Sequence, residues 1–167
     1  MVPRDFLIPL LSAFASFAGA WLAAKLALNN FYRQKLWERK TETYTAIFEA
    51  IHTIERWYDK HFDALVESRE IDDERKMKLR AESNKAEEDL ERRLAGEAWF
   101  IPQAFHARAL KMTYDLKSAA AHKDWHGFLD ESLFVIHGAT KELLPMAADD
   151  LRLGLPWYRR LLRLRSK

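Results

Sequence analysis

The stretch that decides the fold is residues 44–65, YTAIFEAIHTIERWYDKHFDAL. Its apolar side chains recur at alternating steps of three and four residues, which places them along one side of an α-helix. The row consists of Tyr44, Ile47, Ile51, Ile54, Tyr58 and Leu65, with Phe62 at the intermediate step. The stretch therefore predicts a long amphipathic helix whose apolar row needs other helices to cover it.

Three more helices are predicted after this one, because capping residues frame further apolar rows. Ile71 and Asp72 fit a hydrophobic staple and an N-cap, and Gly96 fits the C′ position that ends the same helix. Pro102 suits the first turn of a third helix, and Asp124 suits the N-cap of a fourth. The rows of these helices are Leu79, Ala86, Leu90 and Leu94, then Phe105, Ala109, Met112, Leu116 and Ala119, then Leu129, Leu133, Ile136, Thr140, Leu143 and Ala147.

Individual residues within and between these helices carry further expectations. Trp99, Phe100 and Ile101 form an apolar run that is too short for a useful strand, so we expect them to plug one end of the bundle. Pro145 removes a backbone donor and must kink or end the fourth helix. Gly138 lies inside the same helix, where we expect it to allow close packing.

The composition agrees with a helical bundle. The 167 residues include only five glycines and five prolines, which disfavours a turn-rich β fold. Cysteine is absent, which excludes disulfides, cysteine nucleophiles and thiolate metal sites. The net charge of +2 is too small to indicate nucleic-acid binding. Between Ser68 and Arg93, 17 of the 26 residues are charged, and we interpret this run as a solvated helix face.

On its N-terminal side, the chain carries an uncharged run over residues 6–24, FLIPLLSAFASFAGAWLAA, between Asp5 and Lys25. Nineteen helical residues span roughly 28 Å, close to the hydrocarbon thickness of a bilayer, about 30 Å. Trp21 lies near the far end, where an aromatic side chain suits the interface. The run predicts a transmembrane helix. This helix either continues into the first helix of the bundle or breaks at the membrane surface, for which Asn29-Asn30 is the best place.

Two other interpretations of this run stay open. A secretory signal peptide would use Arg4 as its charged start and Ala18-Gly19-Ala20 as its cleavage site, although the apolar stretch continues past that site into a basic segment. A buried core helix is the other alternative, although such a helix seldom lacks polar residues on every face.

The charges that flank the run predict its orientation. Only Arg4 precedes it, whereas positive residues follow it at Lys25, Arg33, Lys35, Arg39 and Lys40. Because positive residues stay on the cytoplasmic side, we expect a single-pass protein of the inner membrane with most of its chain in the cytoplasm. The predicted organisation is an anchor over 1–28, a cytoplasmic helical bundle over 29–151 and a basic amphipathic tail over 152–167. The fold class is all-α, with an N-terminal transmembrane helix followed by an up-down four-helix bundle whose first helix is long.

Small residues on one face of the anchor suggest self-association. Ala15, Gly19 and Ala23 stand four residues apart, a spacing that allows close approach of helices in lipid. Alanine-rich anchors also carry this spacing by chance, so a chance pattern without self-association is the alternative interpretation.

The C-terminal segment, LPWYRRLLRLRSK over 155–167, combines aromatic, leucine and basic residues. An up-down bundle returns its fourth helix to the end at which its first helix starts, so this segment is expected near the bilayer. Such a segment suits an anionic membrane surface. The expected contact residues are Trp157, Tyr158, Arg159, Arg160, Arg163 and Arg165. A disordered tail or a packing segment of the bundle are the alternatives.

Few residues suggest chemistry. His122 and His126 are spaced to share one helix face, but a zinc site needs a third protein ligand. Candidates such as His106 exist, but the sequence does not show whether they lie near the pair. Solvated histidines explain the pair, and His52, His61 and His137 fall among the apolar rows, where we expect them to be partly buried. The paired carboxylates Asp149 and Asp150 are explained by a helix end beside Arg152. We expect no enzyme, no catalytic residues, no metal site and no cofactor.

The segment FYRQKLWERKTETYTAIFEAI, residues 31–51, directly after an anchor resembles small bacterial membrane-anchored helical-bundle proteins of unassigned function. Residues 146–151, MAADDL, resemble their closing Ala-Arg-x-Asp-Leu pattern, with Ala148 in place of the arginine. The resemblance implies an anchored helical bundle without catalytic residues. Some of these proteins look like accessory parts of phage-encoded or anti-phage systems.

These observations lead to two functional hypotheses. In the first, the chain is an interaction or scaffolding module that self-assembles or holds a protein partner at the cytoplasmic membrane face. In the second, it is a membrane-perturbing, toxin-like oligomeric effector, although residues 6–24 contain no polar stripe for a water-lined path. Membrane lipid is a partner in both hypotheses, and nucleic acid is a partner in neither.

Overall fold

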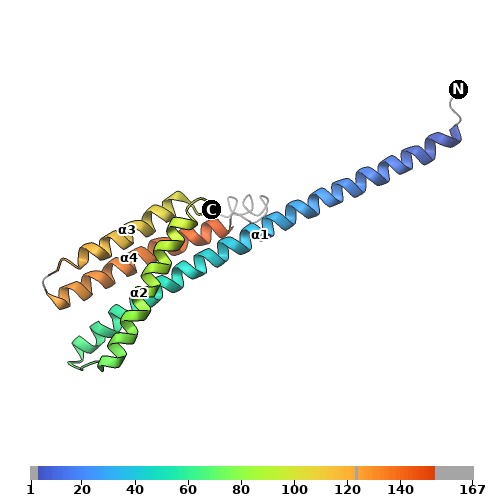
Figure 1. Ribbon diagram of the computed structural model, residues 1–167. Coiled ribbons are helices and arrows are strands. Elements are labelled where there is room, and N and C mark those ends of the chain that lie inside the picture. The colour runs from blue at the N-terminus through green and yellow to red at the C-terminus, as the bar shows by residue number, and fades with distance from the viewer. Residues whose placement is uncertain (1–3, 123, 153–167) are drawn as a thin grey trace, which may run out of the picture. The chain divides into compact units, whose positions relative to one another are not determined.

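The computed structural model describes the backbone of residues 4–122 and 124–152, and the side chains of Phe14, 16–122 and 124–152. It contains four α-helices over this range (Figure 1). They are α1 (Arg4–Val66), α2 (Asp73–Gly96), α3 (Gln103–Ala119) and α4 (Trp125–Arg152). The chain divides into two compact units, Met1–Arg39 and Lys40–Lys167, and each is described here by itself.

The second unit is a helical bundle, and the all-α fold class with a long first helix is confirmed. Helices α3 and α4 lie side by side, as Figure 1 shows. All four helices contribute buried side chains to one core. The largest fully buried side chains are Phe105, Ile47, Ile51, Ile54, Leu90, Leu94, Met112, Leu129, Ile136 and Leu143. Each of these belongs to one of the predicted apolar rows, because burying those rows is what drives the helices together.

The ring of Phe105 lies at the centre of this core. It is fully buried and meets the ring of Tyr44 edge to face, with 4.9 Å between the ring centroids. A second edge-to-face contact joins it to Phe48 at 6.2 Å. Aromatic pairs with this geometry contribute beyond the area that they bury. Phe105 therefore couples α3 to α1 within the bundle.

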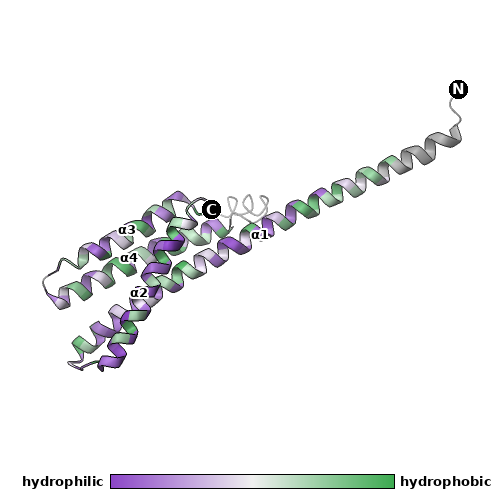
Figure 2. Cartoon of the chain, in the orientation of Figure 1, coloured by the Kyte–Doolittle hydropathy of each residue, from purple (hydrophilic) through white to green (hydrophobic). Residues whose placement is uncertain are grey.

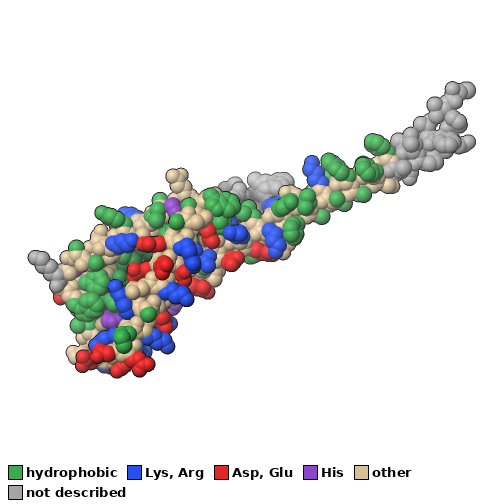
Figure 3. Space-filling model, viewed as in Figure 1, with side chains coloured by type: hydrophobic (Ala, Val, Ile, Leu, Met, Phe, Trp, Pro, Cys, Tyr) green, Lys and Arg blue, Asp and Glu red, His purple; other side chains and the backbone are tan. Residues whose placement is uncertain are grey.

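Helix α2 has a thin apolar seam and an otherwise charged surface. Ala86, Leu90 and Leu94 are buried as predicted, whereas Leu79 is only half-buried. Figure 2 shows α2 as mainly hydrophilic, and Figure 3 shows acidic and basic side chains interspersed over it. Two of its carboxylates still reach other helices through ion pairs, Glu82 to Arg56 of α1 and Glu91 to Lys117 of α3. The charged run is thus a largely solvated face with a few links to its neighbours.

Both predicted aspartate caps are confirmed. The carboxylate of Asp72 accepts hydrogen bonds from the backbone N–H groups of Glu74 and Arg75, at 3.0 and 3.3 Å. That of Asp124 accepts from the N–H groups of His126 and Gly127, at 3.3 and 2.7 Å. These bonds satisfy donors that the first turn of a helix leaves unpaired, and they hold the pKa of Asp124 below its usual range.

The structure decides one open alternative and corrects two expectations about helix ends. Helix α1 is continuous with the predicted anchor and has no break at Asn29-Asn30, because a run of helical hydrogen bonds outweighs the weak preference of two asparagines for a turn. Gly96 is the last residue of α2 rather than its C′ residue, and no described glycine has a positive φ. Pro102 is the N-cap of α3, so the helix itself begins at Gln103.

Other corrections concern single positions within the bundle. Helix α4 continues past Pro145 to Arg152, so of the two expected effects of this proline the helix end is excluded and the kink stays a prediction. A Cβ atom at Gly138 would meet nothing within 4 Å, so this glycine does not serve close packing within the chain. Phe100 and Ile101 are buried as expected, but Trp99 is 77% exposed. Leu65, at the end of the first apolar row, is also exposed because α1 ends one residue later.

The first unit is the N-terminal part of α1. Every side chain from Ser16 to Trp37 is exposed. Over the residues with described side chains, no helix offers a stretch that is long and apolar enough to cross a membrane. Residues 6–13 and 15 of the predicted anchor lie outside the residues whose side chains are described.

Candidate functional site

One candidate site is a polar cluster where the end of α4 meets the first residues of the bundle unit. The ammonium group of Lys40 donates to both carboxylate oxygens of Asp150, at 2.9 and 2.8 Å. The hydroxyl group of Tyr44 donates to the same carboxylate at 2.7 Å. The Asp150 side chain is only 8% exposed and that of Lys40 20%, so this is a shielded ion pair. We refer to Lys40, Tyr44 and Asp150 as the polar clamp.

The protonation state of Tyr44 follows from its surroundings. Burial raises the pKa of its hydroxyl group far above the ordinary value, and the hydrogen bond to Asp150 raises it further. Tyr44 therefore stays neutral and acts as a donor, so the clamp pairs one cation with one anion. The arrangement links the end of α4 to α1.

We expect the stability of the bundle to fall as the pH rises above about 10, the ordinary pKa of tyrosine. Burial raises the pKa values of both Tyr44 and Tyr58 in the folded state, so the unfolded chain loses protons that the folded chain keeps. Replacing Tyr44 with phenylalanine should make this decline about 1.4 kcal/mol shallower per pH unit. Urea unfolding of the full chain in mild detergent at several alkaline pH values measures the slope.

The control for this experiment is Tyr114→Phe, which removes a tyrosine that is 71% exposed. It should retain the slope of the wild type. Equal slopes for the wild type and the Tyr44→Phe variant would contradict the prediction.

The sequence interpretation missed this clamp. It assigned Asp149 and Asp150 to a helix end beside Arg152, whereas the carboxylate of Asp150 points to α1. The available signal was the spacing of Lys40 and Tyr44, which are one helical turn apart and so share a face. Nothing in that spacing says which residue lies opposite.

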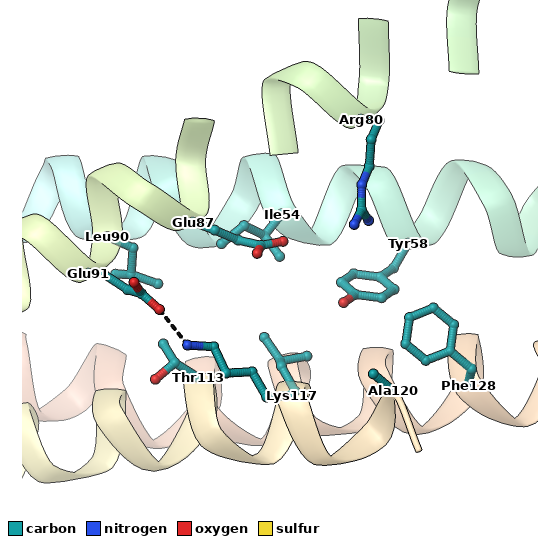
Figure 4. A pocket seen from close by; sticks show the side chains of 11 residues that line it. Ile54, Tyr58, Arg80, Glu87, Leu90, Glu91, Thr113, Lys117, Ala120 and Phe128 are labelled. Atoms are coloured by element: carbon teal, nitrogen blue, oxygen red, sulfur yellow. Dashed lines mark hydrogen bonds and ion pairs between the residues drawn. The ribbon is translucent and has the colours of Figure 1, made fainter. Parts of the chain in front are cut away.

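A second candidate site is a pocket of about 160 Å³ that all four helices line (Figure 4). Its apolar surfaces come from Ile54, Leu90, Leu116, Ala120 and Phe128. Its polar side chains are Tyr58, Arg80, Glu87, Glu91, Thr113 and Lys117. Pockets with an apolar lining and a few convergent polar groups are typical of small-molecule sites.

Aromatic side chains form one wall beside this pocket. The ring of Tyr58 packs edge to face on Trp57 at 4.8 Å and on Phe128 at 5.6 Å. The guanidinium group of Arg80 lies over the ring of Trp57, 5.2 Å from its centroid. Figure 4 shows Arg80 extending from α2 toward Tyr58. These contacts hold the rings in place and draw the positive charge of Arg80 to an aromatic face.

The histidines do not form a metal site among the described residues, where no group of three or more metal-ligating side chains occurs. His122 and His126 are exposed near the start of α4. His52 and His137 are exposed rather than partly buried, and both contact Glu55, at 3.4 and 2.8 Å. Of the three histidines that were expected to be partly buried, only His61 is. Its Nδ1 lies 2.7 Å from the Trp57 carbonyl oxygen.

The predicted membrane and self-association residues are only partly described. Gly19 and Ala23 are exposed on α1, whereas the side chain of Ala15 lies outside the described residues. The expected surface-contact residues of the tail also lie outside them, namely Trp157, Tyr158, Arg159, Arg160, Arg163 and Arg165.

Comparisons of this chain with protein-family models, with curated proteins and with solved structures find no match.

Proposed function

We propose that this protein is a membrane-anchored helical interaction module, which self-assembles or holds a protein partner at the cytoplasmic face of the inner membrane. In this proposal the segment over 1–28 is the anchor, the bundle is the binding part, and the basic tail over 152–167 is a second contact with the same leaflet. The proposed role is binding, without catalysis. We also propose a place in a phage-related or defence system, and the family resemblance alone supports this part.

The observation that carries this proposal is the exposed apolar surface of the first unit. Phe14 and Phe17 are 76% and 74% exposed, and Trp21, Leu22 and Leu26 each expose more than half of their surface. Soluble proteins rarely leave such a continuous apolar surface in water. Lipid chains would cover it, and the uncharged run of which it is part matches the thickness of a bilayer.

The end of the uncharged run also fits a membrane interface. The ammonium group of Lys25 lies over the ring of Trp21, 4.9 Å from the centroid. An indole ring and a lysine with a long apolar stem both suit the headgroup region. This pair supports the predicted orientation, in which Lys25 and the positive residues that follow the uncharged run lie on the cytoplasmic side.

The polar clamp supports a tail that contacts the same leaflet. It fixes Asp150, near the end of α4, to Lys40, which follows the predicted anchor closely in the chain. The predicted tail follows Arg152, the last residue of α4, so its basic residues are close in the chain to Asp150. Each basic residue near an anionic surface contributes about 1 kcal/mol to membrane binding.

The small-residue face supports assembly of several chains. A Cβ atom at Gly19 would meet nothing within 4 Å in this chain, so the face is open to a second helix. Exposed glycine and alanine at this spacing permit backbones to pack closely in lipid. Self-association through Ala15, Gly19 and Ala23 is therefore part of the proposal.

Membrane fractionation of the full chain tests the anchor. We expect the wild type to stay with the membrane after an alkaline carbonate wash. A variant with Phe14→Arg and Ala18→Arg places two charges in the middle of the uncharged run, where each is costly, and should leave the membrane. The matched control is Phe134→Arg, which changes a 74% exposed phenylalanine on α4 and should leave the membrane association intact.

Wild-type protein in the soluble fraction would contradict the anchor. Purification of the intact protein in mild detergent tests the interaction role. A monomer without any co-purifying protein would count against that role, and growth arrest with membrane depolarisation on overexpression would favour the effector hypothesis instead.

A further inference from the structure

The pocket between the four helices has the size of a small organic group. Its volume is about 160 Å³, and a cavity of about 150 Å³ lined by apolar side chains is known to take up benzene. Ile54, Leu90, Leu116 and Phe128 supply comparable apolar surfaces here. The pocket can therefore receive one aromatic ring or a short alkyl chain.

The charged side chains around the pocket differ in whether they have an ion-pair partner. Glu91 forms an ion pair with Lys117 at 2.7 Å, drawn as the dashed line in Figure 4. Arg80 lies against the ring of Trp57. Glu87, by contrast, receives only a long hydrogen bond of 3.4 Å from Ser83, and no cation among residues 4–122 and 124–152 pairs with it. Figure 4 shows its side chain extending toward the middle of the pocket.

The Tyr58 hydroxyl group faces the same space (Figure 4). Burial raises the pKa of Tyr58, which outweighs the opposite effect of the Ser132 hydroxyl group, and the negative charge of Glu87 also acts to raise it. The hydroxyl group is therefore neutral, and its oxygen has lone pairs that can accept a hydrogen bond. The Tyr58 oxygen and the Glu87 carboxylate, which has no ion-pair partner among the described residues, therefore give the pocket two acceptors for a donor that carries positive charge.

We propose that this pocket binds a small hydrophobic primary amine in its protonated form. The ammonium group lies between the Glu87 carboxylate and the Tyr58 hydroxyl oxygen, and the apolar body lies among Ile54, Leu90 and Leu116. An anionic ligand is disfavoured because Lys117 is already paired with Glu91 and Arg80 lies over the ring of Trp57, which leaves the carboxylate of Glu87 as the charge without an ion-pair partner among the described residues that line the pocket. This inference concerns the bundle alone and does not depend on the anchor.

Calorimetric titration of the full chain in mild detergent with 2-phenylethylamine tests the proposal. We expect saturable binding of the amine. The control ligand 2-phenylethanol has the same shape without the charge and should bind at least about fivefold more weakly. This ratio corresponds to about 1 kcal/mol, the contribution of a partly solvated ion pair. The Glu87→Gln variant should lose a similar factor for the amine. The control Glu88→Gln changes an adjacent exposed carboxylate that does not line the pocket, and it should bind as the wild type does.

A second variant, Ala120→Phe, tests the location by filling the pocket from its rim. It should abolish binding while circular dichroism shows the helical content of the wild type. Absence of saturable binding, equal affinity for the amine and the alcohol, or wild-type affinity of either Glu87→Gln or Ala120→Phe would each overturn the proposal.

Discussion

Replacing Asp150 with alanine is expected to lower the free energy of unfolding of the bundle by about 3 kcal/mol. The change leaves the ammonium group of Lys40 in a shielded place without its anion, and it leaves the Tyr44 hydroxyl group without its acceptor. Unpaired groups that are removed from water cost more than a lost surface contact. Urea unfolding of the full chain in mild detergent, followed by circular dichroism, measures the difference.

Two further variants separate the contribution of the ion pair from that of the Tyr44 hydrogen bond and compare the clamp with an exposed ion pair. Asp150→Asn keeps an acceptor for Tyr44 but removes the ion pair, so it should cost less than Asp150→Ala. Lys117→Met breaks an ion pair between helices whose side chains are 70% and 54% exposed, and it should change stability by less than about 1 kcal/mol. If Asp150→Ala costs no more than Lys117→Met, the clamp does not stabilise the bundle.

Replacing Phe105 with alanine is expected to cost about 3–5 kcal/mol, the range for a large aromatic side chain in a closed core. Phe105 is fully buried, and its ring packs on Tyr44 and Phe48 of α1. The truncation removes these contacts and leaves a cavity that rigid helices fill only in part. A loss of this size is a large fraction of the stability of a small domain, so the variant should unfold at much lower urea concentrations.

The matched control lies on the same helix. Tyr114→Ala removes an aromatic side chain that is 71% exposed, and it should change stability by less than about 0.5 kcal/mol. A similar loss for both variants would contradict the prediction, because it could not come from burial of the Phe105 ring, and alanine itself favours the helix.

Local features were predictable from the sequence because they depend on neighbours in the chain. The apolar rows of all four helices follow from the period of the α-helix, and Ile47, Leu94, Met112 and Leu143 are buried as that period predicts. The capping roles of Asp72 and Asp124 follow from a carboxylate that reaches the next backbone N–H groups.

Positions where two local preferences compete were predicted less well. The asparagine pair at 29–30 and Pro145 each disfavour a helix locally, but the hydrogen bonds of the surrounding turns carry the helix through them. Gly138 illustrates a different limit, because a small residue in a helix does not show whether a neighbour uses the space.

The sequence by itself determined that this protein is helical, where α2 and α4 start and which faces the helices bury, because each of these properties arises from residues a few positions apart. Only the tertiary structure decided which groups meet. Asp150 pairs with Lys40 across 110 residues and with Tyr44 across 106, and the pocket around Glu87 combines side chains from four helices. Periodicity fixes the face on which a side chain lies, but not the side chain that faces it, because that depends on how the helices pack against one another.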